Sequence, residues 1–275
     1  MEKEYLVRHF ARVGALLKIG VRPAIRRFWW TRDIDVLIDV IQTPRGEAFH
    51  LTVDEEALPD LDIHAVDVQP KQKHLLLLVK RLSGASERRK EKFLCGLDEC
   101  HWFVAAVPEA RGIAHVEDAM EALKPRPVLL SQHRNKVKRR DRNKRRNAGF
   151  IRQGEWFFLP RPGYKPIHPN LILRNEPIRR GRGKPHIVEE VFRIGGETVY
   201  VSHAYPNGLQ EEAYRHLLRH DPTAHRLGWR VMQRNPTVYA RGKVRHPDHK
   251  TVVLPFWHQV AMNVERSAST VAFLD

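Results

Sequence analysis

The chain has 275 residues, of which 42% are hydrophobic and 29% are charged. A chain of this length and composition folds into one large or two ordinary globular domains rather than staying disordered. Apolar runs such as residues 75–79 have the length of one buried strand. They fall far short of the roughly 20 apolar residues that a membrane-spanning helix needs.

The formal net charge is +16, from 48 Lys and Arg against 32 Asp and Glu. A field of this sign attracts polyanions, nucleic acid first and anionic membrane second. The chain has only two cysteines, Cys95 and Cys100, so we expect no disulfide scaffold and a reducing, cytoplasmic location. The N-terminus is rich in Arg, but it begins with MEKE, and these acids favour a packed helix over a mitochondrial presequence.

Residues 1–32 are predicted to form an N-terminal helical segment. Apolar residues recur there at helical spacing, namely Leu6, Phe10, Val13, Leu16 and Leu17. Residues 33–126 are predicted to form a compact, mainly antiparallel β domain. Its expected strands and final short helix cover residues 33–40, 48–53, 63–68, 74–81, 92–95, 101–107 and 114–123. The turn signal at residues 44–46 indicates that the first two strands form a hairpin.

Residues 127–149 are predicted to form a basic helical linker, because residues 128–147 contain no Gly or Pro. Residues 150–275 are predicted to form a second β-rich domain. It would contain a strand at 154–160, a hairpin of 187–194 with 197–202 across Gly195-Gly196, a helix at 209–219, and strands at 238–244, 251–254 and 260–264. The predicted class is α+β, with two small, mainly antiparallel β domains, an N-terminal helix and a basic connecting helix.

The opening of the second domain, RQGEWFFLP at residues 152–160, and the later HPDHKTVVLP at residues 246–255 carry a resemblance. The region 150–265 resembles small, uncharacterised bacterial and phage proteins with a Gln-Gly-Asp opening strand and a His-x-x-His turn. This chain departs from the pattern, since Glu155 replaces the Asp and the middle Gly-His-x-His motif is reduced to GKPH at residues 183–186. The resemblance implies a domain boundary near residue 150 and no particular chemistry.

The basic segment, residues 134–146, holds half of the net charge of the chain. Nine cations and one acid, Asp141, give it a charge of +8: Arg134, Lys136, Lys138, Arg139, Arg140, Arg142, Lys144, Arg145 and Arg146. Burying so many unpaired charges would cost several kcal/mol per group. We therefore expect these side chains to contact phosphates of DNA or RNA. Contact with about six phosphates would give a log–log salt slope of roughly −5.

Other interpretations of the basic segment are an acidic protein partner, an inert linker or a membrane surface. Membrane binding would need apolar side chains opposite the cations, and Val137 is the segment's only apolar side chain. A second cationic element supports nucleic-acid binding, the RRGRGK sequence of residues 179–184 with Arg179, Arg180, Arg182 and Lys184. The RRFWW sequence at residues 26–30 also places aromatic rings beside cations, although two Trp at a helix end usually cap a core.

Histidines offer the clearest candidate chemistry. In HPDH, a type I turn would bring the Cα atoms of His246 and His249 within about 7 Å of each other. Both imidazoles could then bind one divalent metal ion, with Asp248, His258 or His186 as the third ligand. Such an ion can activate water for phosphodiester hydrolysis, and His246, His249 and His258 are then the candidate catalytic residues of a nuclease. The alternative without a functional site is a polar turn with exposed histidines.

Other candidate sites are weaker. Ser202 next to His203 lacks a nucleophile elbow. Cys95, Cys100 and His101 lack the fourth ligand of a zinc site, so structural cysteines are expected. The aspartates of the first strand, Asp33, Asp35 and Asp39, are expected on its solvent side. The sequence thus predicts a nucleic-acid-binding protein, with a metal-dependent nuclease as the alternative.

Overall fold

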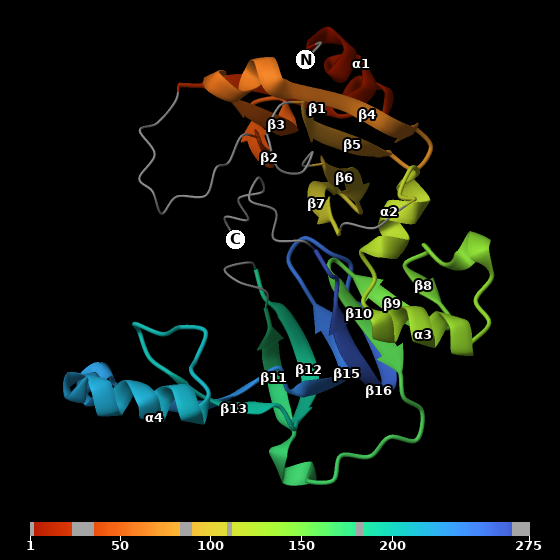
Figure 1. Cartoon of the computed structure of the whole chain (residues 1–275). Helices are drawn as coiled ribbons and strands as arrows, with labels where there is room; N and C mark the ends of the chain where they lie inside the picture. Colours follow the sequence, from red (N-terminus) through yellow and green to blue (C-terminus); the bar gives the residue numbers. More distant parts are fainter. Residues whose placement is uncertain (1–2, 24–35, 83–89, 109–111, 180–183, 266–275) are drawn as a thin grey trace.

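The computed structural model describes residues 3–23, 36–82, 90–108, 112–179 and 184–265. It shows an α+β protein with mostly antiparallel sheets and an N-terminal helix, as predicted. Two sheets from the first half of the chain lie above one large sheet from the second half (Figure 1). No helix among the described residues has both the length and the apolar character of a membrane crossing.

The first half contains a three-stranded and a four-stranded sheet. Helix α1 (Lys3–Arg12) precedes the smaller sheet, in which β1 (Leu16–Arg22) runs parallel to β3 (Gly46–Asp54) and β2 (Val36–Thr43) forms the predicted hairpin with β3. The larger sheet is an antiparallel meander. Its strands are β4 (Leu61–Gln69), β5 (His74–Arg81), β6 (Lys90–Asp98) and β7 (His101–Val107).

The predicted N-terminal helix is shorter than its apolar spacing indicates. The helix ends at Arg12, where Gly14 takes a positive φ of 84° and donates to the carbonyl of Ala11, while the N–H of Ala15 bonds to Phe10. This pair of bonds is a Schellman stop, which Gly favours because it has no Cβ to clash in the left-handed region. Residues 16–22 then form a strand. The RRFWW cluster at residues 26–30 lies outside the described residues.

Both sheets of the first half share one core. Phe49 of β3 is fully buried and packs edge-to-face against Phe10 of α1 and Trp102 of β7, with ring centroids 5.0 and 5.6 Å away. Helix α2 (Val116–Ala122) packs in a separate apolar cluster with residues from β5, β6 and β7. The four-stranded sheet therefore has apolar packing on both faces, which fixes the position of the β6–β7 turn.

The second half is built on a seven-stranded sheet of order β11-β12-β15-β16-β10-β9-β8. Its strands are β8 (Arg146–Asn147), β9 (Phe150–Gln153), β10 (Trp156–Pro160), β11 (Leu173–Ile178), β12 (His186–Ile194), β15 (Thr237–Arg245) and β16 (Val252–Met262). The predicted strands at 251–254 and 260–264 are one strand, β16. Pro255 is accommodated because the β15–β16 register shifts between Ala240 and Gly242, and a bulge relieves Pro of its ladder bond.

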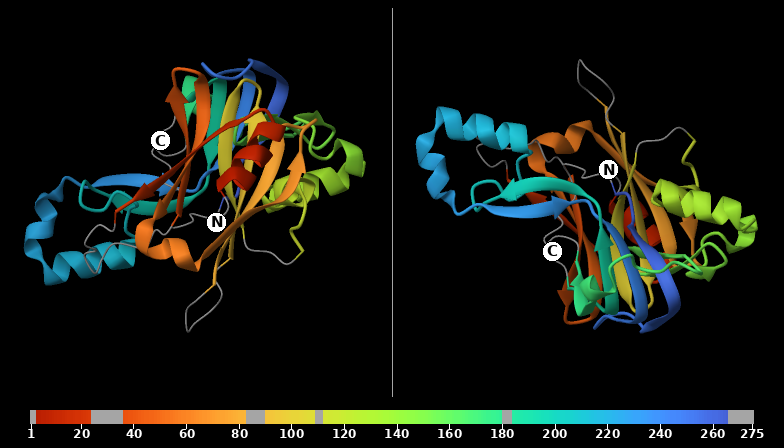
Figure 2. Two further views of the ribbon diagram at one scale, coloured as in Figure 1. Left: turned by 90° about the horizontal axis from the view of Figure 1, so that it is seen from above. Right: turned by 90° about the horizontal axis from the view of Figure 1, so that it is seen from below.

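The predicted hairpin across Gly195-Gly196 is wrong. Strand β12 pairs with β15, whereas β13 (Glu197–Val201) pairs with β14 (Arg230–Arg234). Both glycines have positive φ, and a Cβ on Gly196 would lie 2.9 Å from the carbonyl oxygen of Arg234. The glycines therefore direct the two-stranded β13–β14 ribbon away from the seven-stranded sheet. Helix α4 (Glu211–His220) lies at the far end of this ribbon (Figure 2).

The predicted basic helix also ends early. Helix α3 (Arg126–Arg134) stops where Lys136 takes a positive φ of 50° and the N–H of Val137 bonds to the carbonyl of Gln132. This is a second Schellman stop, and Val137, the one apolar residue of the basic segment, is buried against it. The segment then continues as turns and a short 3-10 helix, Arg139–Asp141. Repulsion between like charges disfavours a longer helix.

The positive φ of Lys136 in this Schellman stop gives a stability prediction. Replacing Lys136 by Gly should raise the free energy of unfolding by up to about 1 kcal/mol, because Gly adopts this conformation without the clash of a Cβ. The matched control is Lys138→Gly at an extended position (φ −63°, ψ 147°), which should lower stability by roughly 0.4–1 kcal/mol. Urea titration measures both, and an equal loss in the two variants would contradict the assignment.

Candidate functional site

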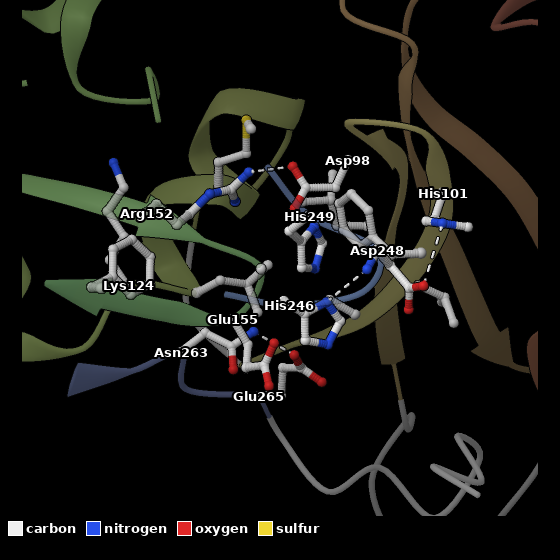
Figure 3. Close-up of a pocket in the computed structure, with 18 of the residues that line it drawn as sticks. Asp98, His101, Lys124, Arg152, Glu155, His246, Asp248, His249, Asn263 and Glu265 are labelled. Atoms are coloured by element: carbon white, nitrogen blue, oxygen red, sulfur yellow. Dashed lines mark hydrogen bonds and ion pairs between the residues drawn. The ribbon is translucent and has the colours of Figure 1, made fainter. Parts of the chain in front are cut away.

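A pocket of about 530 Å³ lies where the two halves of the chain meet. The first half contributes the β6–β7 turn and the adjoining wall of β7, and the second half contributes the β9–β10 turn, the start of β12 and the β15–β16 turn. Figure 3 shows His246 and His249 within this pocket, with Asp98 and Arg152 to one side and Glu155 to the other.

Three histidines meet in the pocket and form what we call the histidine cluster, His186, His246 and His249. One ring nitrogen from each lies within 4.8 Å of the other two. The ring centroids of His186 and His246 are 4.2 Å apart, those of His246 and His249 4.7 Å, and those of His186 and His249 5.7 Å. His186 is thus the third histidine among the alternatives left open by the sequence.

The cluster follows from the sheet register. Ile187 pairs with Arg245 in the antiparallel ladder of β12 and β15, so the preceding His186 faces the following His246. His249 comes back from the same turn before β16 begins. The buried amide of Gln153 holds this turn at both ends, donating to the carbonyl oxygens of Val244 at 3.3 Å and Lys250 at 2.7 Å.

His186 is buried, and neither of its ring nitrogens has a hydrogen-bond partner among the described residues. Burial, followed by the nearness of His246 and His249, lowers the pKa of His186 to about 3. Burial is also the main cause that lowers the pKa of His246, with a further contribution from His249. His186 is therefore neutral near pH 7, and a lone pair on its ring is free to bind an electrophile.

Gly154 leaves a space beside the cluster. A Cβ there would lie 2.9 Å from Nε2 of His249 and 3.4 Å from Nε2 of His186. The Nε2 atoms of two rings therefore face the same small volume. Gly154 also has a positive φ of 57°, so a side chain at this position would be strained as well as crowded.

Different groups lie beside the two turn histidines. Nδ1 of His246 accepts a 3.1 Å hydrogen bond from the backbone N–H of Asp248. Nδ1 of His249 lies 3.6 Å from a carboxylate oxygen of Glu99, and the same oxygen accepts the backbone N–H of Lys250 at 2.7 Å. The β6–β7 turn of the first half thus contacts the β15–β16 turn directly.

Ion pairs join the two halves beside the pocket. Asp98 pairs with Arg145 and, at 2.9 Å, with Arg152, and Glu99 pairs with Arg145. The side chains of Asp98 and Glu99 are only 13% and 14% exposed, so these contacts are partly shielded from water. Four residues of this region were not predicted as site residues from the sequence: Asp98, Glu99, Arg152 and Gln153. For Gln153 a signal was present, because it is the Gln of the Gln-Gly pair in the RQGEWFFLP motif.

Other predicted site residues lie outside the cluster. His258 is buried in β16 and its Nδ1 contacts the carbonyl oxygen of Phe256 at 2.7 Å, so the structure does not bring it to His246 and His249. The carboxylate of Asp248 is bound by Lys184 at 2.8 and 3.0 Å. Burial raises the pKa of the Cys95 thiol, which agrees with a structural role. Asp33 and Asp35 lie outside the described residues.

The basic segment borders the pocket and divides into inward and outward cations. Arg145 points to Asp98 and Glu99, whereas Arg140 and Lys144 share Asp141. Arg142 is half-buried and contacts the carbonyl oxygen of Val137 at 3.5 Å. The remaining cations are exposed, and no carboxylate of the described part of the chain lies within 4.0 Å of their charged atoms: Arg134, Lys136, Lys138, Arg139 and Arg146.

The second basic element is only partly described. Arg179 is exposed, and Lys184 lines the pocket through its ion pair with Asp248. Arg180 and Arg182 lie outside the described residues. Of the described residues of this element, Lys184 is exposed but paired with Asp248, so Arg179 is the one that adds an exposed cation with no carboxylate partner in the described chain.

Comparison with known proteins finds no match: no family model, no curated protein and no solved structure. The resemblance of residues 150–265 to small bacterial and phage proteins stays a prediction. Function is therefore inferred from the site itself.

The ion pairs between the halves give a second stability prediction. Asp98→Ala should lower the free energy of unfolding by about 1–3 kcal/mol, because Arg152 and Arg145 lose a shielded, charged partner. The control, Asp62→Ala, removes a carboxylate that is 42% exposed and that pairs, among the described residues, with His64. It should change stability by less than about 0.5 kcal/mol. Equal effects in urea titration would show that the contact between the halves does not depend on Asp98.

Proposed function

We propose that the protein binds nucleic acid through the exposed cations of the basic segment. One observation supports this most directly: five of the nine cations are exposed and have no carboxylate partner in the described chain, and all five lie within one stretch of 13 residues. Phosphates would neutralise their mutual repulsion and release condensed counterions. Because no base-reading motif accompanies them, the expected contact is with the backbone of DNA or RNA.

The ion pairs reduce the number of cations that the sequence offered for phosphate contact. Arg145 is committed to Asp98 and Glu99, and Arg140 and Lys144 share one carboxylate. Five unpaired cations correspond to about five phosphates. The expected salt slope is then about −4.5, from a factor of about 0.9 per phosphate on duplex DNA.

Binding and its salt dependence test the proposal. Fluorescence anisotropy with labelled duplex DNA and single-stranded RNA should show tight binding at low salt and the slope just given. Replacing the five unpaired cations by Gln lowers the net charge from +16 to +11 (16 − 5) and should remove most of the slope. The substituted residues are Arg134, Lys136, Lys138, Arg139 and Arg146.

The matched control removes the same charge elsewhere. It replaces five exposed cations of the first half by Gln: Lys3, Arg8, Arg12, Lys18 and Lys71. This variant also has a net charge of +11 and should bind almost as the parent does. Equal losses would mean that net charge alone attracts the probe, and no binding by the parent at low salt would leave an acidic protein as the partner of the segment.

Metal-dependent phosphodiester hydrolysis is the second candidate function, favoured by the histidine cluster in the neighbouring pocket. A water deprotonated on a metal ion there would add to phosphorus, the ester P–O bond would break, and the leaving oxygen would take up a proton. The pocket is also lined by Lys184 and Arg152, but both are paired with carboxylates. Phosphate attraction would therefore depend mainly on the basic segment.

Cleavage assays separate binding from hydrolysis. Labelled DNA or RNA incubated with Zn²⁺, Mn²⁺ or Mg²⁺ should be cut only with added metal. His246→Ala should reduce the rate by at least about 100-fold, as loss of a metal ligand does, while leaving anisotropy titrations unchanged. Cleavage that persists in His246→Ala, or no cleavage with any of the three ions, would leave nucleic-acid binding as the whole function.

A further inference from the structure

The histidine cluster has three features that an ordinary buried histidine lacks. Its three rings come from two separate segments and converge within 4.8 Å. His186 is buried, and neither of its ring nitrogens has a partner in the described chain, a state that is unfavourable for a polar group. Gly154 leaves a gap onto which the Nε2 atoms of two rings open. A buried polar group normally finds a partner, so an unpartnered ring that converges with two others on an open gap is what a bound ion would explain.

We propose that His186, His246 and His249 bind one divalent transition-metal ion of the zinc class and leave one coordination position open to the pocket. Three imidazoles and a water form the donor set of a catalytic rather than a structural zinc site. This inference does not depend on nucleic-acid binding, because none of the three residues belongs to the basic segment.

The donor atoms select the kind of ion. Two of the carboxylates near the cluster bind other groups: Asp248 binds Lys184, and Glu99 binds Arg145 and the backbone of Lys250. A set of nitrogen donors suits Zn²⁺, Co²⁺, Ni²⁺ or Cu²⁺, whereas Mg²⁺ and Ca²⁺ require oxygen ligands. The ion that this cluster would hold is therefore different from the one that an aspartate-based nuclease uses.

The rings must draw together to hold the ion. Tetrahedral zinc with Zn–N bonds of about 2.0–2.1 Å places its nitrogens roughly 3.3 Å apart, about 1.5 Å closer than the widest spacing here. His246 and His249 are only partly buried and lie in a turn, so they can move toward His186, which is fixed in β12. Gly154 offers no side chain to oppose this movement.

Second-layer contacts differ for the two turn histidines. The carboxylate of Glu99 lies 3.6 Å from Nδ1 of His249 and, after a small approach, would accept a hydrogen bond from Nδ1–H and so direct Nε2 to the metal, as carboxylate partners of zinc-bound histidines do. Nδ1 of His246 already accepts the N–H of Asp248, which puts the ring proton on Nε2. If Nε2 of His246 bound the metal ion, the ring proton would move to Nδ1, and the 3.1 Å hydrogen bond from Asp248 would be lost.

Metal titration tests the site directly. The full chain, without a polyhistidine tag and stripped with EDTA, is titrated with ZnCl₂ by calorimetry and with CoCl₂ by visible absorption. One ion should bind per chain, and Co²⁺ should give the intense bands of a tetrahedral site. His246→Ala and His249→Ala should each weaken binding by at least about 100-fold, since even outer-layer partners change affinity by about 10–100-fold.

Two controls keep the result interpretable. His216 and His220 of α4 stack at 4.0 Å on an exposed helix and form the most similar surface pair in the described chain. Their double Ala variant should bind metal as the parent does. Circular dichroism establishes that the His246 and His249 variants, both altered in a turn, remain folded. The proposal is overturned by absent binding, by binding that survives the His246→Ala/His249→Ala double variant, or by binding that requires His216 and His220.

Discussion

The ion pairs of Asp98 and Glu99 with Arg145 and Arg152 are the constraint on which the site depends. They cross between two halves of the chain whose cores are separate clusters. Shielded ion pairs of this kind add little net stability because desolvation offsets their attraction, but their geometry is exacting. They place the β6–β7 turn against the β15–β16 turn. Glu99 thereby reaches both His249 and the backbone of Lys250.

The same ion pairs explain why the basic segment is not uniform. Arg145 works inward as part of the contact between the halves, whereas Arg139 and Arg146 have no carboxylate partner in the described structure and face solvent. Composition identified the segment as a whole, since nine cations in 13 residues cannot all be buried. It could not assign a role to each cation, because the partners of Arg145 lie more than 40 residues away in the sequence.

Local patterns predicted several strands and the β2–β3 hairpin, but not the strands β1, β11 and β14 or the partners of β12 and β13. Strands β5 and β7 have the predicted bounds, because their apolar runs are set off by polar residues and turns. The hairpin at Gly195-Gly196 failed for a different reason. Two glycines mark a change of direction, but whether the chain folds back on itself or leaves the sheet depends on pairing with β14 and β15, some 40 residues later. The ends of helices α1 and α3 were predicted too late in the sequence, because Gly14 and Lys136 end them with Schellman stops.

The histidine cluster also shows that local sequence predicts contacts within a turn but not contacts that depend on strand pairing. The turn in HPDH allowed His246 and His249 to be placed together from sequence, because their separation is local. The third member could not be chosen between His186 and His258 without the strand order. Register decides it: Ile187 opposite Arg245 brings His186 to His246, while His258 lies opposite Ala240 in the middle of the β15–β16 ladder.

Burial then sets the protonation state of His186, and with it the ability of the ring to bind a ligand. An imidazole with water around it would be partly protonated near its ordinary pKa and would repel a cation. Within the pocket, desolvation and the neighbouring rings hold His186 neutral, and no donor or acceptor of the described chain occupies its nitrogens. Stability alone would favour an apolar residue at such a position, since an unsatisfied buried polar group only costs free energy. Of the two ring nitrogens of His186 that have no partner in the described chain, Nε2 faces the gap at Gly154, where the proposed metal ion would bind it.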